Sequence, residues 1–207
     1  RGVKLMGLWT SPATVIFTNK DEITSLDQLN GLKLRSPSPL FDNIGKEMNI
    51  VTVNAPASES YEMLSRGVID GLYFQYDQIE NFKLDKLIKS AVAVPGGFGK
   101  SSQFLFMNER KWNQISPEDQ EAISKISGEH IARMFGGKWN EAEQKAIKTL
   151  TDAGLKTYHV EGEELAKLQN DLTFIEEDWI KAADKKKVDG KAALDYFRAQ
   201  IEELSNP

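Results

Sequence analysis

The feature that most constrains this chain is an alternation of short strand-like runs with short helical segments. Apolar or alternating runs of strand length occur at residues 2–9, 15–17, 32–35, 50–53, 68–74, 87–94, 104–107 and 157–160. Helical patterns lie between several of these runs, at 25–29, 41–48 and 58–66. Strands that are joined through helices pair in parallel by right-handed crossovers. The sequence therefore predicts an α/β fold with a parallel sheet.

A long helical segment follows the run at 104–107. The stretch from Ser116 to Asp119 is a strong helix start, with a capping serine, a proline in the first turn and acids at the positive end of the dipole. Apolar residues then recur at helical spacing as far as Thr151, so an unbroken helix would be roughly 50 Å long. Gly128 and the pair Gly136–Gly137 are the points where it could bend. We expect such a helix to span two lobes. Two amphipathic helices, at about 163–185 and 190–204, end the chain.

Composition limits the functional classes that fit the chain. Its formal net charge is -5, which argues against a nucleic-acid partner because that role needs a concentrated basic face. No apolar run reaches the roughly 20 residues that cross a bilayer, so we expect a protein that is not membrane-embedded. The absence of cysteine excludes disulfides, thiolate metal ligands and cysteine nucleophiles. The chain begins at Arg1 rather than Met, which indicates processing or truncation, with any export signal already removed.

No motif in the sequence carries catalytic or cofactor chemistry. Residues 94–101 resemble a phosphate-binding loop, but Val94 replaces the first glycine of that pattern and a strand-like segment follows. A glycine-rich hinge or loop is the favoured interpretation. The two histidines, His130 and His159, have no partner at metal-ligand or triad spacing, and we interpret them as surface or packing residues. We therefore expect no cofactor, no metal and no catalytic residue.

Arg35 is the strongest candidate for a ligand-binding residue. It ends the strand-like run at 32–35, and in open α/β sheets ligands bind beyond the carboxyl ends of strands. A guanidinium at that place can donate two parallel hydrogen bonds to a carboxylate. Trp9 and the aromatic-rich run 73–77 also lie at predicted strand ends and are suited to form pocket walls. The spacing leaves a structural alternative open, in which Arg35 forms a salt bridge and the aromatics belong to the core.

Five motifs, taken in order, resemble the substrate-binding proteins of tripartite ATP-independent periplasmic (TRAP) transporters. They are Gly31-Leu32-Lys33-Leu34-Arg35-Ser36-Pro37, Pro56-Ala57-Ser58-Glu59-Ser60-Tyr61, Arg66-Gly67-Val68-Ile69-Asp70-Gly71, Met107-Asn108-Glu109-Arg110-Lys111-Trp112 and Ile115-Ser116-Pro117-Glu118-Asp119-Gln120. The resemblance implies a two-lobed α/β fold of the periplasmic-binding-protein type. It also implies a periplasmic receptor, monomeric and not an enzyme, that closes around a small organic acid and delivers it to a membrane permease.

The resemblance also implies a division of the chain into lobes. Members of the family are longer by on the order of 120 residues, and a chain of that full length still fits the usual two-domain size range. The resemblance therefore implies that the first part of lobe one is absent here. The implied segments are a hinge strand at 1–8, the first part of lobe two at 9–100, a returning piece of lobe one with the start of the long helix at 101–140, and the C-terminal helices of lobe two at 141–207.

Site residues are implied by individual matches to the family. Its carboxylate-pairing arginine matches Arg35, while Val15 occupies the place of the second arginine of sialic-acid-binding relatives. Phe74 and Ala57 replace an asparagine and a phenylalanine of those relatives, and a Trp-Glu pair of another branch falls on Tyr76-Asp77. These departures favour a monocarboxylate with hydrophobic or aromatic bulk. The implied ligand-binding set is Arg35, Trp9, Phe74, Tyr76, Asp77, Ser36 and Ala57.

Two other functional classes stay open at this point. An α/β enzyme that acts on a small carboxylate would use Tyr76, Asp77 or His159 as acid or base, although no constellation of titratable groups supports turnover. A scaffold or interaction module would bind no small molecule. Binding and turnover assays with carboxylic acids separate the three classes.

Overall fold

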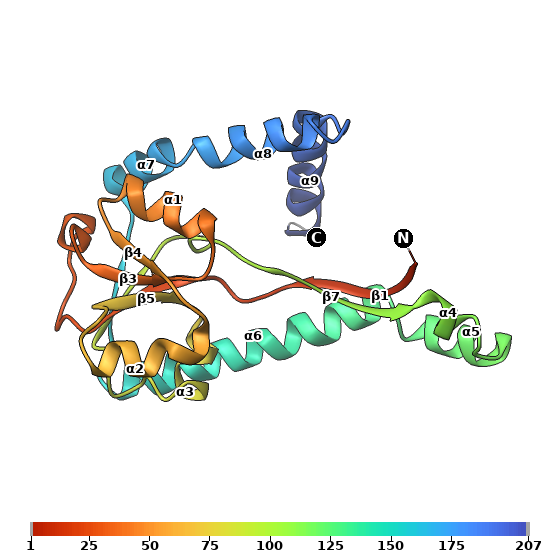
Figure 1. Cartoon of the computed structure of the whole chain (residues 1–207), viewed down its shortest axis with the longest axis horizontal. Helices are drawn as coiled ribbons and strands as arrows, with labels where there is room; N and C mark the ends of the chain where they lie inside the picture. The colour runs from red at the N-terminus through yellow and green to blue at the C-terminus, as the bar shows by residue number, and fades with distance from the viewer. Residues whose placement is uncertain (1, 206–207) are drawn as a thin grey trace. The chain divides into compact units, whose positions relative to one another are not determined.

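The computed structural model describes residues 2–205 and has a mixed α/β architecture, which confirms the predicted fold class (Figure 1). The chain divides into two compact units, one that extends to Val160 and one that starts at Glu161. The lobe boundaries that the family resemblance implies stay a prediction.

The first unit contains a six-stranded sheet. Its strands, in the order β4-β3-β5-β2-β6-β8, are Val51–Asn54, Lys33–Ser36, Gly71–Phe74, Val15–Thr18, Ser90–Ala93 and Lys156–His159. The pairs β3–β4, β3–β5 and β6–β8 are parallel, as predicted, but β2 is antiparallel to both of its neighbours. The prediction of an all-parallel sheet is therefore wrong at β2. The chain reaches β2 directly from an extended segment and not through a helical crossover, so the crossover rule does not fix its direction.

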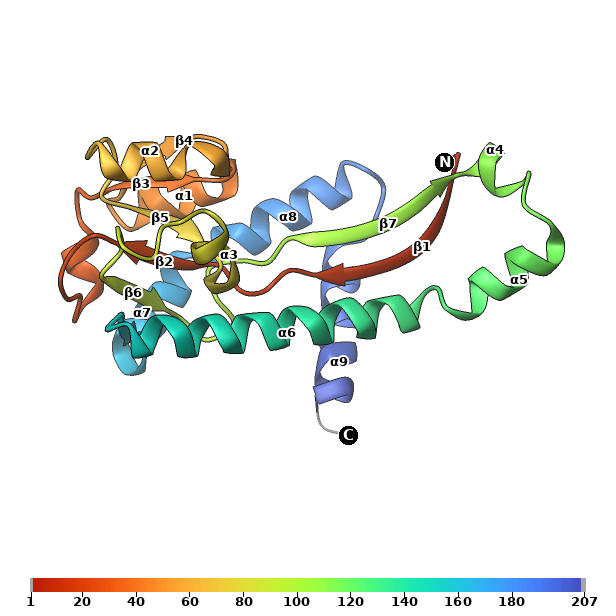
Figure 2. The ribbon, with the colours of Figure 1, turned by 90° about the horizontal axis from the view of Figure 1, so that it is seen from below.

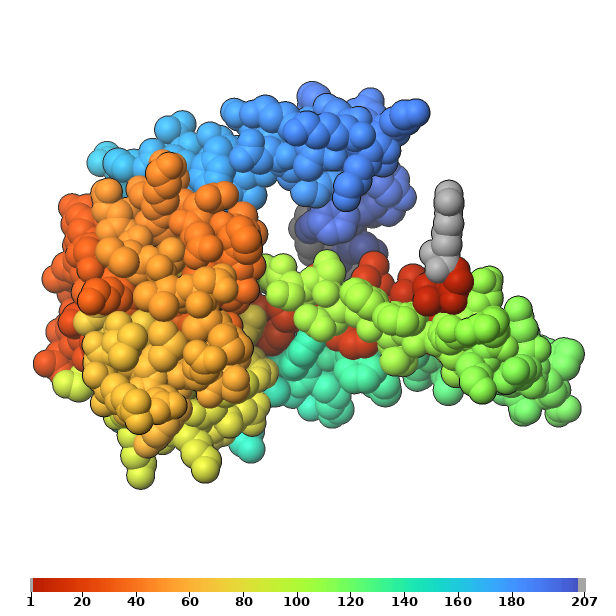
Figure 3. Space-filling model, in the orientation of Figure 1, coloured from red at the N-terminus to blue at the C-terminus, as the bar shows by residue number. Residues whose placement is uncertain are grey.

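Helices cover both faces of this sheet. Helix α1 (Pro39–Glu47) lies on one face, while α2 (Ser60–Ser65) and α3 (Tyr76–Asn81) lie on the other (Figure 1). In the space-filling view, residues 39–65 form a continuous surface over this part of the unit (Figure 3). The helix predicted at 58–66 begins at Ser60, because Ala57–Glu59 form a short 3₁₀ turn that precedes it. On the face that α2 and α3 cover, the buried core includes Phe17, Leu72, Phe74, Tyr76, Ile79, Ala146 and Leu150.

A two-stranded antiparallel ribbon forms the other part of this unit. Its strands are β1 (Val3–Thr10) and β7 (Ser102–Asn108), and α4 (Glu109–Trp112) follows directly. The ribbon runs beside helix α6 (Glu129–Asp152), as Figure 2 shows, and β1 packs against it. Met6, Trp112 and Ile131 form the buried centre of this contact.

The long helical segment is broken once. Ser116 caps α5 (Pro117–Lys125) as predicted, because its side chain accepts a hydrogen bond from the Asp119 N–H at 3.1 Å. Gly128 separates α5 from α6 with φ 64° and ψ -123°, which confirms the bend predicted there. The pair Gly136–Gly137 lies inside an unbroken α6, so no bend occurs at that point. With 24 residues, α6 is about 36 Å long.

The second unit is helical. It consists of α7 (Gly162–Asp171), α8 (Phe174–Asp184) and α9 (Gly190–Ser205), where the sequence predicted two helices. The helix predicted at 163–185 ends early, since the Thr173 hydroxyl donates to the carbonyl of Asn170 and competes with the helical hydrogen bonds. Among residues 2–205 no helix combines the length and apolar character that a membrane span requires.

Two glycines of the first unit should respond to alanine in opposite ways. A Cβ at Gly71 would press on the carbonyl oxygen of Phe17 and lie 2.8 Å from Cδ2 of Leu34, whereas a Cβ at Gly137 would meet no atom within 4 Å. We expect Gly71→Ala to reduce the free energy of unfolding by about 2 kcal/mol or more. The control Gly137→Ala should raise it by about 0.5–1 kcal/mol, because alanine favours a helix interior. Urea unfolding followed by tryptophan fluorescence measures both, and equal effects would contradict the packing described for β5.

Asp70, which precedes β5, links three strands of the sheet. Its carboxylate accepts from Lys20 Nζ at 3.0 Å and from the Lys33 backbone N–H at 2.9 Å. Partial burial acts to raise the pKa of Asp70, but the Lys33 hydrogen bond and the Lys20 charge outweigh it and lower the pKa below its usual 3.8. This carboxylate is therefore a structural element and not an acid or base.

Replacing Asp70 should make the free energy of unfolding depend less on pH in the acidic range. Because the folded-state pKa of Asp70 is depressed, its contribution is present above 3.8 and is lost as the pH falls through the folded-state value. We expect Asp70→Asn to lower the free energy of unfolding at pH 7 by about 1 kcal/mol. The difference from the parent protein should shrink below pH 4 in urea titrations. A difference that is constant with pH would show that the charge of Asp70 is not what stabilises the sheet.

Candidate functional site

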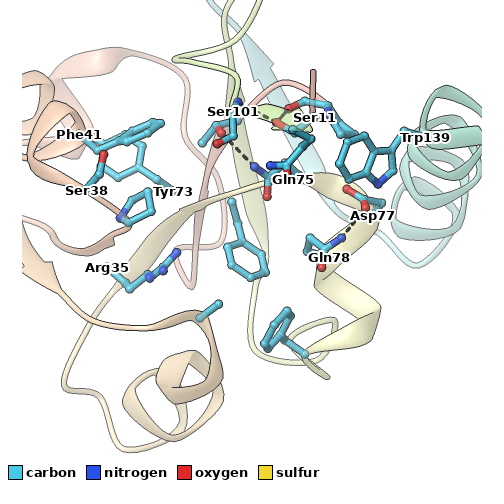
Figure 4. Close-up of a pocket in the computed structure, with 17 residues that line it drawn as sticks. Ser11, Arg35, Ser38, Phe41, Tyr73, Gln75, Asp77, Gln78, Ser101 and Trp139 are labelled. Atoms are coloured by element: carbon cyan, nitrogen blue, oxygen red, sulfur yellow. Dashed lines mark hydrogen bonds between the residues drawn. The ribbon is translucent and has the colours of Figure 1, made fainter. Parts of the chain in front are cut away.

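A cavity of about 430 Å³ opens beside the carboxyl ends of β3 and β5 (Figure 4). Such a volume lies in the range of small-ligand sites. All of its lining belongs to the first unit, and the side chains come from the loop before β2, the end of β3, α1, the end of β5, α3, the start of β7 and α6. The lining residues are Ser11, Pro12, Thr14, Arg35, Pro37, Ser38, Phe41, Ala57, Tyr73, Phe74, Gln75, Asp77, Gln78, Phe82, Ser101, Gln103 and Trp139.

Arg35 carries the positive charge of this cavity. Its side chain is only 6% exposed, its Nε donates to the carbonyl of Ala55 at 2.7 Å, and its guanidinium carbon lies 5.7 Å from the ring centre of Phe74. Burial lowers the pKa of Arg35, although a guanidinium stays charged at neutral pH. No ion pair within residues 2–205 involves it, so the structural salt bridge left open by the sequence does not form. In Figure 4 its terminal nitrogens point toward the middle of the cavity.

Aromatic rings form much of the wall around this charge. Phe74 meets Phe82 edge to face with ring centres 5.3 Å apart, and Phe41 lies 5.1 Å from Tyr73. Tyr73 is 1% exposed, and burial, with the charge of Asp42 as a second cause, strongly raises the pKa of its hydroxyl. These contacts fix the rings in place, so the cavity has a preformed apolar surface next to the guanidinium.

The wall opposite Arg35 is polar. The Gln75 side-chain N–H donates to the Thr14 hydroxyl at 3.3 Å, and the Gln78 side-chain N–H donates to Oδ2 of Asp77. Glu143 of α6 lies nearby. Burial raises the pKa of its carboxyl, and repulsion from Asp77 adds to that effect. Within the described part of the chain no cluster of three His, Cys, Asp or Glu side chains is suited to hold a metal ion.

The structure brings four of the predicted site residues together. Arg35, Ala57, Phe74 and Asp77 all line the cavity, with Arg35 and Asp77 on opposite sides (Figure 4). Arg35 and Phe74 are adjacent because their strands, β3 and β5, are paired in parallel and end at the same edge of the sheet. The role of each residue in binding stays a prediction.

The other three predicted residues lie outside the lining. Trp9 belongs to the ribbon and stacks on Phe135 of α6, with ring centres 4.4 Å apart. Tyr76 turns into the core, where it meets Phe17 edge to face. Ser36 is fully buried below Arg35, and its hydroxyl donates to the carbonyl of Ser38 at 3.0 Å.

Several lining residues were not singled out by the sequence. Phe41 and Trp139 come from helices whose patterns indicate only which face is apolar, and no local signal marks a pocket residue there. Tyr73 and Gln75 belong to the run 73–77, which the sequence did mark as a group.

Comparison with known proteins gives consistent matches. The sequence matches the family described as bacterial extracellular solute-binding protein, family 7, over residues 1–182. The curated outer membrane transporter protein TsaT of Comamonas testosteroni is 30% identical over 203 residues, which cover 96% of this chain and 59% of TsaT.

Solved structures show the same fold. A TRAP periplasmic solute-binding protein from Bordetella bronchiseptica with bound (R)-mandelate and (S)-mandelate has a TM-score of 0.88 at 30% identity, covering 99% of this chain and 65% of that one. A marine metagenome TRAP solute-binding protein specific for aromatic acid ligands, in complex with metahydroxyphenylacetate, has a TM-score of 0.87 at 27% identity. The match covers 97% of this chain and 64% of that one. The chain thus spans less than two-thirds of the length of these relatives.

These matches agree with the order of motifs in the sequence and with the α/β fold of the first unit. The structural neighbours are solute-binding components of transporters and not enzymes. The chain belongs to family 7 of the bacterial extracellular solute-binding proteins, the substrate-binding proteins of TRAP transporters.

Proposed function

We propose that the protein is a periplasmic receptor that binds an aromatic monocarboxylate and delivers it to a TRAP-type membrane permease. The observation that carries this proposal is the buried guanidinium of Arg35, which faces a cavity without an acidic partner among residues 2–205. Family membership supports the transport role, and the solved relatives are periplasmic proteins. Since the chain spans only part of the length of its relatives, the activity of the whole protein is part of the proposal.

Arg35 is suited to bind a carboxylate end-on. The Ala55 carbonyl occupies its Nε–H, which leaves the four N–H groups of the two terminal nitrogens for an incoming anion. Two of these can donate in parallel to the two oxygens of one carboxylate. Because a buried charge is costly until it is paired, the anion gains both the hydrogen bonds and the relief of that cost. One cationic group in the lining favours a monocarboxylate over a dicarboxylate.

The aromatic walls support an aromatic acid. Phe41, Tyr73, Phe74 and Phe82 present rings whose positions are fixed by mutual contacts, and such surfaces pack well against a flat ring. The Bordetella relative was solved with mandelate and the marine metagenome relative with metahydroxyphenylacetate, both of which are aromatic acids. A ligand ring next to Phe74 would place its carboxylate within reach of Arg35.

Release to the permease requires that the site open and close. In the proposed receptor the ligand contacts both lobes only in the closed state and so shifts the population toward closure. The predicted lobe segments, with 9–100 and 141–207 in lobe two and 101–140 returning from lobe one, are part of this proposal. The monomeric state of the receptor is also part of this proposal.

Removing the guanidinium should abolish high-affinity binding. We expect Arg35→Ala to raise the Kd for an aromatic acid such as phenylacetate by a hundredfold or more, because two charge-assisted hydrogen bonds are lost. Arg35→Lys should recover only part of the affinity, since an ammonium cannot form the bidentate pair. Isothermal titration calorimetry of the full-length protein measures these values.

The control for this experiment is Arg66→Ala, which removes an exposed arginine that pairs with Glu62 on the surface of α2. Its Kd should equal that of the parent protein. The melting temperature of unliganded Arg35→Ala should stay close to that of the parent, because the substitution also removes a desolvated charge. An unchanged affinity in Arg35→Ala would show that the acid is held elsewhere.

A receptor should return its ligand unchanged. Native mass spectrometry of the full-length protein with one aromatic acid should show a single bound molecule, and the acid recovered after denaturation should have its original mass. The enzyme alternative, with Asp77, Tyr76 or His159 as acid or base, predicts a product of different mass. Accumulation of such a product with time would contradict the receptor function.

A further inference from the structure

We propose that Asp77 and Glu143 share one proton when the receptor holds its acid ligand, so that ligand binding and proton uptake are coupled. The inference rests on the proposed function, because it assumes that the carboxylate of the ligand lies at Arg35. It goes further in naming a proton-binding site beside the cavity and the direction in which pH changes the affinity.

The two carboxylates belong to helices that pack against each other. Asp77 lies in the first turn of α3 and lines the cavity on the side opposite Arg35 (Figure 4). Helix α3 contacts α6, the helix that carries Glu143. Trp139 of α6 lines the same cavity, and Glu143 follows it by four residues, so both side chains project from one face of the helix. Glu143 therefore lies on the face of α6 that meets the cavity.

Glu143 also borders a second depression of the first unit. This depression has a volume of about 280 Å³, and its lining shares Ser11, Pro12 and Trp139 with the lining of the cavity. Glu143 is half-buried in it. A carboxyl group at this place can exchange a proton with solvent in the depression while a ligand occupies the cavity.

Two charged groups act on Glu143, and they come from different elements. Burial raises the pKa of Glu143 above its usual 4.5, the negative charge of Asp77 on α3 raises it further, and the positive charge of Lys100 in the loop before β7 opposes both. Tyr76 of α3 also lies near, but burial, with the charge of Glu143 as a further cause, raises the pKa of its hydroxyl, so it is neutral at physiological pH. The nearest effective charge to Glu143 is therefore a second carboxylate.

Asp77 has an oxygen that can receive the shared proton. Its Oδ2 accepts from the Gln78 side-chain N–H, whereas its Oδ1 is buried and accepts no hydrogen bond from any residue between 2 and 205. A buried acceptor that stays unpaired is unfavourable. In the proposed pair, a proton from solvent adds to Glu143, and the resulting O–H donates to Oδ1 of Asp77. Two carboxyl groups that share a site in this way hold one proton between them.

A bound acid favours the protonated pair. In the free protein the charge of Arg35, across the cavity, offsets part of the negative charge of the pair. A ligand carboxylate neutralises that charge, so the pKa of the pair is higher in the complex than in the free protein. Binding then takes up protons, and the affinity rises as the pH falls. The coupling operates above pH 4.5, the usual pKa of glutamate, and disappears at alkaline pH, where the pair is ionised in both states.

Calorimetry at two pH values tests the inference. We expect the Kd of the full-length protein for phenylacetate to be about three- to tenfold lower near pH 5.5 than near pH 7.5. The ligand stays largely ionised at both values, since an ordinary carboxyl group titrates near pH 4. Titrations near pH 6 in two buffers of different ionisation enthalpy should show net proton uptake on binding.

Matched variants identify the groups that hold the proton. Glu143→Gln keeps the shape of the side chain but cannot ionise, so it should bind phenylacetate near pH 7.5 about as tightly as the parent protein does near pH 5.5, without proton uptake. Asp77→Asn removes the other half of the pair and should also abolish the uptake. The control Glu141→Gln changes an exposed carboxylate of α6 that pairs with Lys138, and it should keep the uptake and pH dependence of the parent. Melting temperatures establish that each variant is folded.

The outcomes separate the two proposals. Equal Kd values at both pH values without proton uptake contradict the inference and leave the receptor function intact. Proton uptake that persists in Glu143→Gln, or tighter binding at the higher pH, also contradicts it. Absence of phenylacetate binding at either pH contradicts the proposed function and, with it, the inference.

Discussion

A buried positive charge with no acidic partner among residues 2–205 is the constraint on which the candidate site depends. Arg35 is held by the carbonyl of Ala55 and the ring of Phe74, and both contacts orient the guanidinium without neutralising it. A cation–π contact and one neutral hydrogen bond offset only part of the cost of removing such a charge from water. The folded protein therefore retains a charge that is not neutralised, and an anion from solution can pair with it.

The sheet order explains why these three groups meet. In the parallel arrangement β4-β3-β5, Arg35 is in register with Val53 of β4 and Leu72 of β5. Ala55 and Phe74 each lie two residues beyond those positions, so a carbonyl from one neighbour and a ring from the other flank the guanidinium at the same edge. The close approach of the strands at Gly71 and the carboxylate clamp at Asp70 keep this register at the opposite end of β5.

Local sequence patterns were sufficient to predict those parts of the fold and site that depend only on residues close together in the sequence. The strand that carries Arg35, the cap at Ser116 and the break at Gly128 follow from side-chain chemistry within a few residues. Position at a strand end did not reveal side-chain direction. Trp9 lies next to the end of β1 and Phe74 ends β5, yet Trp9 packs in the ribbon because β1 is not part of the six-stranded sheet. The direction of β2, and the presence of Phe41 and Trp139 at the cavity, depend on tertiary packing that no local pattern encodes.

Helix α6 connects the cavity to both cores of the first unit. Ala146 and Leu150 belong to the core under the sheet, Ile131 belongs to the core under the ribbon, and Trp139 lies between them at the cavity. Because α6 packs under the six-stranded sheet at one end and against the ribbon at the other, a ligand that contacts Trp139 would touch the helix that joins these two parts. In the proposed receptor, binding energy at the pocket would in this way favour one arrangement of the ribbon and the six-stranded sheet, as closure on a ligand requires.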